Sequence, residues 1–347
     1  MVFIHQSACT SPQVSLLNND TASIQESVHN VLHIIEPKYE GIPLGVLRRM
    51  GKAVRMGIGA AMPLLKTHTK PLNGIVIGTA NGGMEDCIKF LNQVIEFKEG
   101  TLTPTSFVQS TTNAIASQIG LFSVNKGYNI THVNRGFSFE NALLDVMMLL
   151  NEHPSHAYLL GGVEEISTYN YNIDYLAGSY KEEIISNLAL YDTQTPGTIA
   201  GEGVAMFVVD SEMNGALASV DAIKLLPIDR VDELVVQLQA FLVEYLAEGE
   251  TIDVLLTGEN GDVRSKPFYN AVEQVVKDTA IARYKHLTGE FAAASSISLY
   301  IACQVLEMQS IPSHMLKSTL VEKNINKILI YNNHKGVQHS FMLVSKV

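Results

Sequence analysis

Cysteine is scarce in this 347-residue sequence, and its three cysteines form no pattern that builds a disulfide framework. Cys9, Cys87 and Cys303 lie far apart and include no CxxC pair, which fits a reducing compartment. Cys87 and Cys303 fall in expected helices, whereas Cys9, near a strand end, is expected to be the most accessible. None has a neighbour that would stabilise a thiolate, so none is a good candidate nucleophile.

Positive charge is scarce as well, because 24 Lys and Arg stand against 35 Asp and Glu, for a formal net charge of -11. Nucleic acids and anionic membranes are bound by clustered Lys and Arg, so this balance argues against both. No window reaches the roughly 18 uninterrupted apolar residues of a membrane span. The first residues, "MVFIHQSACTSP", lack the basic and long apolar regions of a signal peptide. We therefore expect a soluble cytoplasmic protein.

Ligand-binding patterns are also missing. None of the 11 histidines has a second His, Cys or carboxylate at the spacing of a metal site. The segment "GTANGG" (78–83) offers backbone N–H groups that could hold a phosphate, but it matches neither the dinucleotide fingerprint nor the P-loop. A plain turn between a strand and a helix is the favoured interpretation. We expect neither a metal nor a cofactor.

What the sequence does contain is 46% hydrophobic residues in alternating strand and helix patterns, enough for a large core. The expected strands are 73–78, 131–134, 156–167, 251–257 and two within 327–346, with 197–210 and 215–226 expected to pair as antiparallel neighbours. The expected helices run from Met84 to about Phe97, from Asn113, and over 138–152, 231–248 and the end of 285–309.

The chain follows the same pattern twice. A tight elbow and a nearly apolar helix occur at 131–150 and again at 285–309, and each is followed by two strands. The stretch around 170–196 is polar, rich in Tyr and irregular, and we expect it to form a surface excursion. The elbow at "NRGFS" (134–138) has the form of a nucleophile turn, yet no thiol lies in it.

Two acidic positions are candidates for chemistry. Glu202, between two glycines at the head of a strand, is expected to fold its carboxylate back onto backbone N–H groups or a buried cation. Lys285 precedes Glu290 and the start of a helix, where a glutamate is ordinarily favoured by the helix dipole. His286 lies beside Lys285, although a single loop histidine is more often structural.

Taken in order, these segments resemble the β-ketoacyl synthases of the thiolase superfamily. The resemblance rests on "RGFSFENA" (135–142) at the nucleophile loop, "LLGGVEE" (159–165), "GEG" (201–203), "KHLTGE" (285–290) and "NNHKGVQHS" (332–340). It implies an α/β thiolase fold, with two pseudo-repeated βαβαβαββ halves in a five-layer αβαβα arrangement. The halves would be 1–210, with the excursion near 170–196, and 211–347.

The sequence departs from this family at the catalytic positions. The nucleophilic Cys falls on Gly136, with Arg135, Phe137 or Ser138 as the neighbouring alternatives. The first His, of an H-G-T motif, falls on Thr257, and the second His falls on Glu290; only the Lys is kept, as Lys285. Condensation needs a thiolate for the acyl chain and imidazoles for the enolate. The chain is therefore not expected to condense acyl groups alone.

The resemblance favours a catalytically silent subunit, similar to the chain-length factors of polyene or flexirubin-type pathways. Such a subunit would pair with an active β-ketoacyl synthase, shape its acyl channel and meet an acyl carrier protein through the complex. The segment 103–120 resembles synthase-like proteins of polyene-type pathways, and its part 103–117 is expected at the channel wall and the partner, through Phe107, Gln109 and Thr112. Phe137 and Phe139 are expected to fill substrate space, and Gly136 to meet the tight geometry of the elbow.

Two alternatives stay open. The chain could be an acyl-thioester decarboxylase or hydrolase that uses Glu290 and Lys285, with His286 and Glu202; an ion pair of Glu290 with Lys285 is the favoured interpretation there. It could also be a structural homodimer that only binds carrier protein, although its acidity argues against docking an acidic partner directly.

Overall fold

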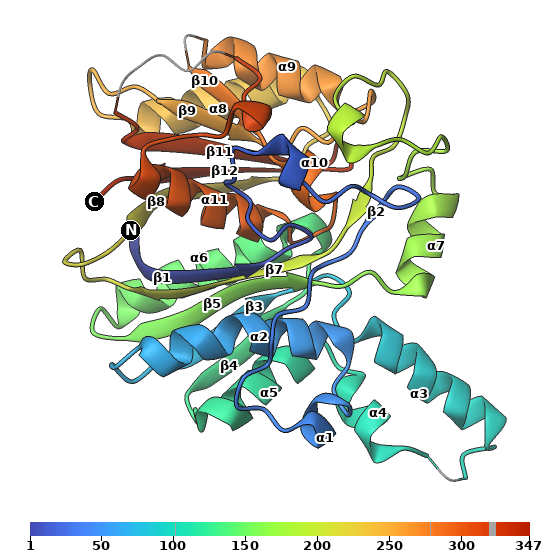
Figure 1. Cartoon of the computed structure of the whole chain (residues 1–347). Helices are drawn as coiled ribbons and strands as arrows, with labels where there is room; N and C mark the ends of the chain where they lie inside the picture. The colour runs from blue at the N-terminus through green and yellow to red at the C-terminus, as the bar shows by residue number, and fades with distance from the viewer. Residues whose placement is uncertain (101, 278, 319–323) are drawn as a thin grey trace.

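The computed structural model describes residues 1–100, 102–277, 279–318 and 324–347 (Figure 1). Its strands form a ten-stranded sheet in the order β10-β9-β11-β12-β8-β1-β7-β5-β3-β4, together with a two-stranded pair of β2 (Val31–Leu32) and β6 (Ala200–Gly201). Each half of the large sheet contains three neighbouring parallel strands followed by two antiparallel ones. The sequence prediction of a pseudo-repeated α/β fold is confirmed.

The first half of the sheet holds β1 (Val2–Thr10), β3 (Gly74–Gly78), β4 (Tyr128–His132), β5 (Ala157–Glu164) and β7 (Gly203–Asp210). The second holds β8 (Ala218–Leu226), β9 (Val254–Thr257), β10 (Ala280–Arg283), β11 (Lys327–His334) and β12 (Gln338–Ser345). The two sets of five occupy matching places in the strand order. Whether 1–210 and 211–347 are separate domains stays a prediction.

Helices complete a five-layer arrangement of the thiolase type (Figure 1). The central layer is formed by α6 (Ser138–Glu152) and α11 (Ser295–Met308), which lie between the two halves of the sheet. The outer layers hold α2 (Lys52–Thr67) and α5 (Ala114–Ser123) on one side, and α8 (Val231–Tyr245) and α9 (Lys266–Val275) on the other. Small residues allow close approach in the centre: a Cβ at Gly162 would lie 2.5 Å from Cβ of Ser296.

One expected strand pairing is wrong. Strands β7 and β8, within 197–210 and 215–226, are not neighbours, because β1 lies between them and pairs antiparallel with both. In β1, Phe3 faces Asp210 of β7 on one side and Ser219 of β8 on the other. The two strands follow each other in the chain with a short connection, which is also the pattern of a hairpin, so local sequence could not reveal the inserted strand.

The remaining helices are α1 (Leu44–Leu47), α3 (Met84–Glu96), α4 (Pro104–Gln109), α7 (Thr168–Leu176) and α10 (Lys285–Thr288), with short 3-10 turns at Thr21–Ser23, Arg135–Phe137, Asn187–Ala189 and Ser313–Met315. All four residues of α10 are buried. The α3–α4 arm projects from one corner of the molecule (Figure 1). Within the described ranges, no helix combines the length and the apolar character that crossing a bilayer requires.

The two edges of the large sheet differ. At β10 the chain covers its own edge, because Ala282 forms an antiparallel bridge with Leu316 and the Ile281 N–H donates to Oγ of Ser318 (2.9 Å). Strand β4 pairs with β3 on one side, and no strand of the described residues pairs with its other side. One half of the sheet therefore ends on an open edge.

Candidate active site

The elbow connects β4 to α6 through a turn at Arg135–Phe137. Its left-handed residue is Arg135, with φ of 48°, and not Gly136, so the tight geometry expected at Gly136 does not consist of a positive φ. Ser138 closes the turn, since its Oγ accepts from the Asn134 N–H (2.9 Å) and donates to the Arg135 carbonyl (2.8 Å). The elbow therefore keeps its shape through the serine.

Gly136 has a different role, which is to leave room for His334. A Cβ at Gly136 would lie 2.5 Å from Cγ and 2.9 Å from Cδ2 of His334, so any side chain there would overlap the imidazole. The Gly136 N–H donates to Oε1 of Gln338 (2.9 Å), which lies opposite His334 in the β11–β12 ladder. The space that a side chain at residue 136 would need is thus occupied from the last hairpin.

Lys285 and Glu290 form an ion pair deep in the molecule. The Lys285 side chain is 0% exposed, and its Nζ lies 2.7 Å from Oε1 of Glu290. The second carboxylate oxygen, Oε2, accepts from Nδ2 of Asn260 (2.9 Å). Both oxygens of Glu290 are therefore engaged, as the favoured interpretation of this pair predicted.

The imidazole at the elbow interacts electrostatically with this ion pair. Burial lowers the pKa of His334 to about 3, and the positive charges of Lys335, Lys285 and Arg135 act in the same direction. The imidazole at the elbow thus lies within electrostatic reach of Lys285 and is neutral at physiological pH. Sequence reasoning missed His334, and its only signal was the loop "NNHKGVQHS", whose packing partner lies about 200 residues earlier in the chain.

Thr257 ends β9 and is fully buried. Its Oγ1 has no hydrogen-bond partner among the described residues. The side chain that this segment brings to Glu290 is that of Asn260. The assignment of Thr257 to the first His position stays a prediction, and Asn260 is the residue of "LTGENG" that takes part in the site.

Glu202 and His286 are engaged elsewhere. The buried Glu202 carboxylate accepts from the N–H groups of Ile34 (3.0 Å) and Ile166 (2.8 Å) and lies 2.5 Å from Nζ of Lys52, as its sequence context predicted. His286 lies 3.2 Å from the Tyr191 hydroxyl and 3.0 Å from Nδ1 of His314, and burial lowers its pKa to about 3. Neither residue joins Glu290 in an acid–base set.

The turn at 78–83 is not a phosphate site in this conformation. The N–H groups of Ala80 and Asn81 donate to the carboxylate of Glu164, at 2.8 and 2.9 Å. Burial raises the pKa of Glu164 to about 8, whereas these two donors lower it. The favoured interpretation, a structural turn, agrees with this geometry.

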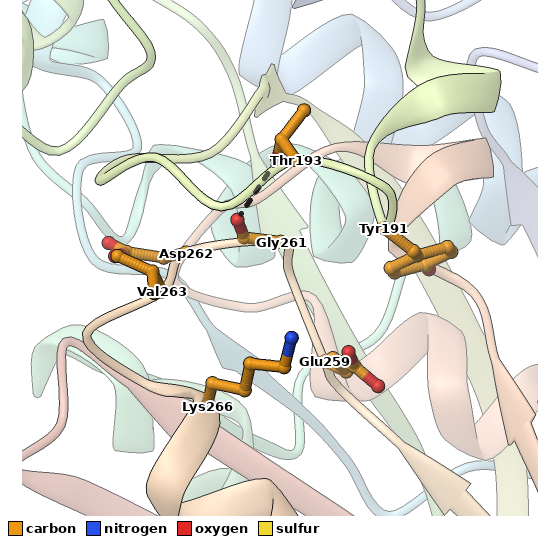
Figure 2. Close-up of a pocket in the computed structure, with 7 residues that line it drawn as sticks. All are labelled: Tyr191, Thr193, Glu259, Gly261, Asp262, Val263 and Lys266. Atoms are coloured by element: carbon orange, nitrogen blue, oxygen red, sulfur yellow. Dashed lines mark hydrogen bonds between the residues drawn. The ribbon is translucent and has the colours of Figure 1, made fainter.

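A small surface hollow is lined in part by the loop that carries Asn260 (Figure 2). It is lined by Tyr191, Thr193, Glu259, Gly261, Asp262, Val263 and Lys266. Glu259 is held there by Lys317, at 2.8 Å, and Arg283 lies over the Tyr191 ring, with Cζ 3.8 Å from the centroid. In the part of the chain that the structure describes, no three His, Cys, Asp or Glu side chains come together as metal ligands.

Residues 25–174 match the family model of the beta-ketoacyl synthase N-terminal domain, which covers less than half of the chain. The whole chain superimposes on solved structures of the same fold. One match is a chain from the complex of a type II polyketide synthase acyl-carrier protein with its ketosynthase, bound to the hexaketide. The TM-score is 0.79 at 14% sequence identity, over 100% of this chain and 99% of that one. The chain is β-ketoacyl synthase-like.

Two other similar structures contain chain length factors. The ishigamide ketosynthase/chain length factor gives a TM-score of 0.76 at 15% identity, over 100% of this chain and 99% of that one. The ketosynthase ApeO in complex with its chain length factor ApeC, from Xenorhabdus doucetiae, gives a TM-score of 0.75 at 11% identity. This match covers 100% of this chain and 98% of that one. At these identities the likeness concerns the fold. No curated protein sequence matches the chain significantly.

The synthase-like chain exposes only some of the expected channel and partner residues. Phe107 of α4 is 58% exposed, and Thr112 is half-buried in the turn before α5. Gln109 is buried, and its amide bonds to Gly51 N and Arg49 O of its own chain, so it is not free to reach a partner. Phe137 and Phe139 are also buried, and the Phe139 ring packs 6.0 Å from that of Phe207, so Phe139 belongs to the core.

Neither Cys9 nor Cys303 of the synthase-like chain is held as a reactive thiolate. Burial raises the pKa of the Cys9 thiol, and it raises that of Cys303 to about 12. Cys9 and Cys87 are both half-buried and Cys303 is buried, so the greater accessibility of Cys9 over Cys87 stays a prediction. A thiol that keeps its proton at neutral pH is a poor nucleophile.

Proposed function

We propose that the chain is a catalytically silent ketosynthase-like subunit that pairs with an active β-ketoacyl synthase and shapes its acyl channel. The observation that carries this proposal is the state of the elbow. The backbone and helix that present a nucleophile are retained there, while His334 fills the place of the nucleophilic side chain at Gly136.

The rest of the site agrees with the absence of condensing chemistry. The acyl chain needs a covalent carrier, and the enolate that follows decarboxylation needs hydrogen-bond donors. Glu290 instead presents a carboxylate whose two oxygens are engaged by Lys285 and Asn260. The imidazole that packs on Gly136 belongs to His334, and it covers the site from the last hairpin.

Pairing with another subunit is supported by the edge at β4. The Tyr128 N–H donates inward to Asn73 and the His132 carbonyl accepts inward from Thr79, so the backbone groups of Asn129 and Thr131 point outward. Unpaired strand edges bind strands of other chains. The elements that flank β4 also carry large exposed apolar side chains, which we call the β4 rim: Leu121, Val124, Tyr128, Val133, Leu144 and Met148.

An active synthase is the proposed occupant of this edge because the chain retains the scaffold and lacks the reaction. The neighbouring structures that contain a ketosynthase together with a chain length factor support such a pairing. The net charge of -11 makes direct docking of an acidic carrier protein unfavourable, so we assign that contact to the partner. The resemblance of 103–120 to synthase-like proteins of polyene pathways favours an aryl polyene or flexirubin-type product.

Co-expression with an intact ketosynthase tests the proposal. The partner is one that carries the Cys-His-His set and is encoded next to this chain. Gel filtration with light scattering should give a stable complex with one copy of each subunit. A soluble homodimer of this chain that leaves the synthase unbound would instead favour the structural homodimer.

A further inference from the structure

Residues 178–198 run alongside the loop 258–263, which follows β9 and carries Asn260. The Thr198 hydroxyl donates to the Asn260 carbonyl at 2.6 Å. At Gly261 the loop takes a positive φ of 76°, and a Cβ there would lie 2.5 Å from a backbone carbonyl oxygen of residues 178–198. The loop therefore lies directly against a segment that is distant in the sequence.

One ammonium group joins the two segments. Nζ of Lys181 donates to the Gly261 carbonyl (3.1 Å), to the Thr195 carbonyl (3.2 Å) and to the Thr195 hydroxyl (3.1 Å). A lysine ammonium has three N–H donors and no acceptor, so each of its donors is matched by one oxygen. These oxygens all belong to uncharged groups, and Lys181 is only 2% exposed.

A buried charge of this kind is costly unless its surroundings replace the water that it has lost. Burial lowers the pKa of Lys181, and the nearby carboxylate of Asp262 acts in the opposite direction. Backbone carbonyl oxygens can take the place of water around a cation, as they do around potassium ions in channels. The oxygens of Thr195 and Gly261 thus have the chemistry of a monovalent-cation site that is filled by the end of a side chain.

The path of this loop determines where the Asn260 side chain lies. Its Oδ1 accepts from the Asp262 N–H (3.2 Å), and its Nδ2 donates to Oε2 of Glu290 (2.9 Å). The next residue along the chain, Gly261, is the one whose carbonyl accepts from Lys181. The ammonium group and the amide that engages Glu290 are therefore connected through one peptide unit.

We propose that the oxygens of Thr195 and Gly261 form a site for a primary ammonium group, which Lys181 supplies from within the chain. Through this site Lys181 positions Asn260 on Glu290, so that the second carboxylate oxygen stays engaged and takes no part in acid–base chemistry. Lys181 is thus a positioning residue. The inference goes beyond the proposed function, because it concerns this chain whatever its partner is.

Chemical rescue tests the ammonium site. Lys181→Ala removes the atoms that propylammonium can supply from solution. Hydrogen–deuterium exchange of the purified full-length chain should become at least about tenfold faster in the loop 258–263 of this variant, and propylammonium should restore the slow exchange. Tetramethylammonium at equal ionic strength should not, because it carries the same charge without an N–H donor. Lys126→Ala, which removes an exposed lysine, is the matched control and should exchange like the wild type.

Three results would overturn the site. One is wild-type exchange of the loop in Lys181→Ala, and another is a lack of restoration by propylammonium. The third is equal restoration by both cations, since screening of the acidic chain would then explain the effect. If Lys181→Ala does not fold, refolding in propylammonium is the measurement: recovery supports the site, and failure to recover contradicts it.

A double-mutant cycle tests the positioning of Asn260. Lys181→Met keeps the apolar stem and removes the donors. In urea unfolding, Asn260→Ala should destabilise the wild type more than it destabilises Lys181→Met, because the amide has already left Glu290 in that background. Additive losses, as expected for Asn260→Ala with Lys126→Met, would overturn the positioning role. No synthase is present in these measurements, so their failure would leave the proposed function untouched.

Discussion

Lys285 and Glu290 are charged residues that share a buried environment, and each depends on the other. Lys285 is fully buried and Glu290 nearly so, and their Nζ and Oε1 atoms lie 2.7 Å apart. Removing one partner of a buried pair leaves an uncompensated charge, which costs about 3–5 kcal/mol, whereas removing both is often close to neutral. The pair thus gives the site rigidity without supplying a reactive group.

A double-mutant cycle tests this assignment. Lys285→Met should lower the free energy of unfolding by about 3–5 kcal/mol, and the double variant Lys285→Met/Glu290→Gln should recover most of that loss. Urea unfolding of the single and double variants measures the coupling. Additive losses would show that the two side chains do not act as a pair.

Glu140 is a second buried acid, in the first turn of α6. Its Oε1 accepts from the Ser340 hydroxyl (2.7 Å), and its Oε2 has no hydrogen-bond partner among the described residues. Burial raises its pKa from 4.5 to about 7, while hydrogen bonds from Ser340 and its neighbours act in the opposite direction. The folded chain therefore holds a proton that the unfolded chain releases between these two pH values.

The consequence is a stability that falls as pH rises. Between about pH 4.5 and 7 the native state binds one more proton than the unfolded state, so the free energy of unfolding decreases by about 3 kcal/mol and stays lower above pH 7. Glu140→Gln should remove this dependence and be the more stable protein at pH 8. Denaturant midpoints of both proteins from pH 5 to pH 8 measure it, and parallel profiles would refute the assignment.

The elements of the central layer were the most predictable from sequence. Helices α6 and α11 are apolar or rich in small residues along their whole length, because both of their faces are covered by sheets. The expected boundaries, 138–152 and the end of 285–309, agree with the structure. The position of β1 was not predictable, since its insertion between β7 and β8 depends on pairing with strands about 200 residues away.

The contacts of the site could be predicted only where the residues that form them are close together in the sequence. The elbow, the Lys285–Glu290 pair and the inward-folded Glu202 each follow from a few adjacent residues. His334 and Asn260 reach the site by long-range packing, and Gln109 was expected at a partner although it bonds to the 49–51 segment of its own chain. Short motifs carry no information on such contacts.

The open edge of β4 leads to a prediction about assembly. Leu121 on α5 and Met148 on α6 are 70% and 59% exposed and flank the strand on opposite faces of the sheet. Leu121→Glu should weaken the complex with the synthase at least a hundredfold, because a charge would be buried without a partner, at about 3 kcal/mol. The dissociation constant is measured by interferometry with the synthase immobilised.

The matched control for this experiment is Val243→Glu. Val243 is 84% exposed on α8, in the outer layer of the other half of the molecule. This substitution should leave the complex unchanged. If it weakens binding as much as Leu121→Glu does, the interface is not at β4.

The molecule as a whole is a complete thiolase-type scaffold with a projecting α3–α4 arm. Helix α3 contributes no buried residue, and the Phe107 ring packs against Phe90 at a tilt of 54°, with ring centroids 5.3 Å apart, while most of the Phe107 surface stays exposed. An arm that buries so few of its side chains against its own molecule is suited to contact a partner. We expect it to contribute Phe107 to the wall of the partner's acyl channel.

Phe107→Ala should therefore change the product and not the assembly. In the complex with the active synthase, loss of the ring enlarges the channel, and the product distribution should shift toward longer chains at similar total turnover. Mass spectrometry of the carrier-bound products measures this, with Tyr245→Ala on α8 as the control for a half-exposed aromatic residue. An unchanged distribution would remove Phe107 from the channel.

The proposed function rests on the absence of condensing chemistry in this chain. Its most direct test is to incubate the purified protein alone with malonyl- and acyl-carrier protein and to measure carbon dioxide and 3-oxoacyl thioester. We expect neither product above the level without protein, and condensation only once the active synthase is added. Turnover by the protein alone that disappears in Glu290→Ala would contradict it and would identify the chain as an acyl-thioester enzyme.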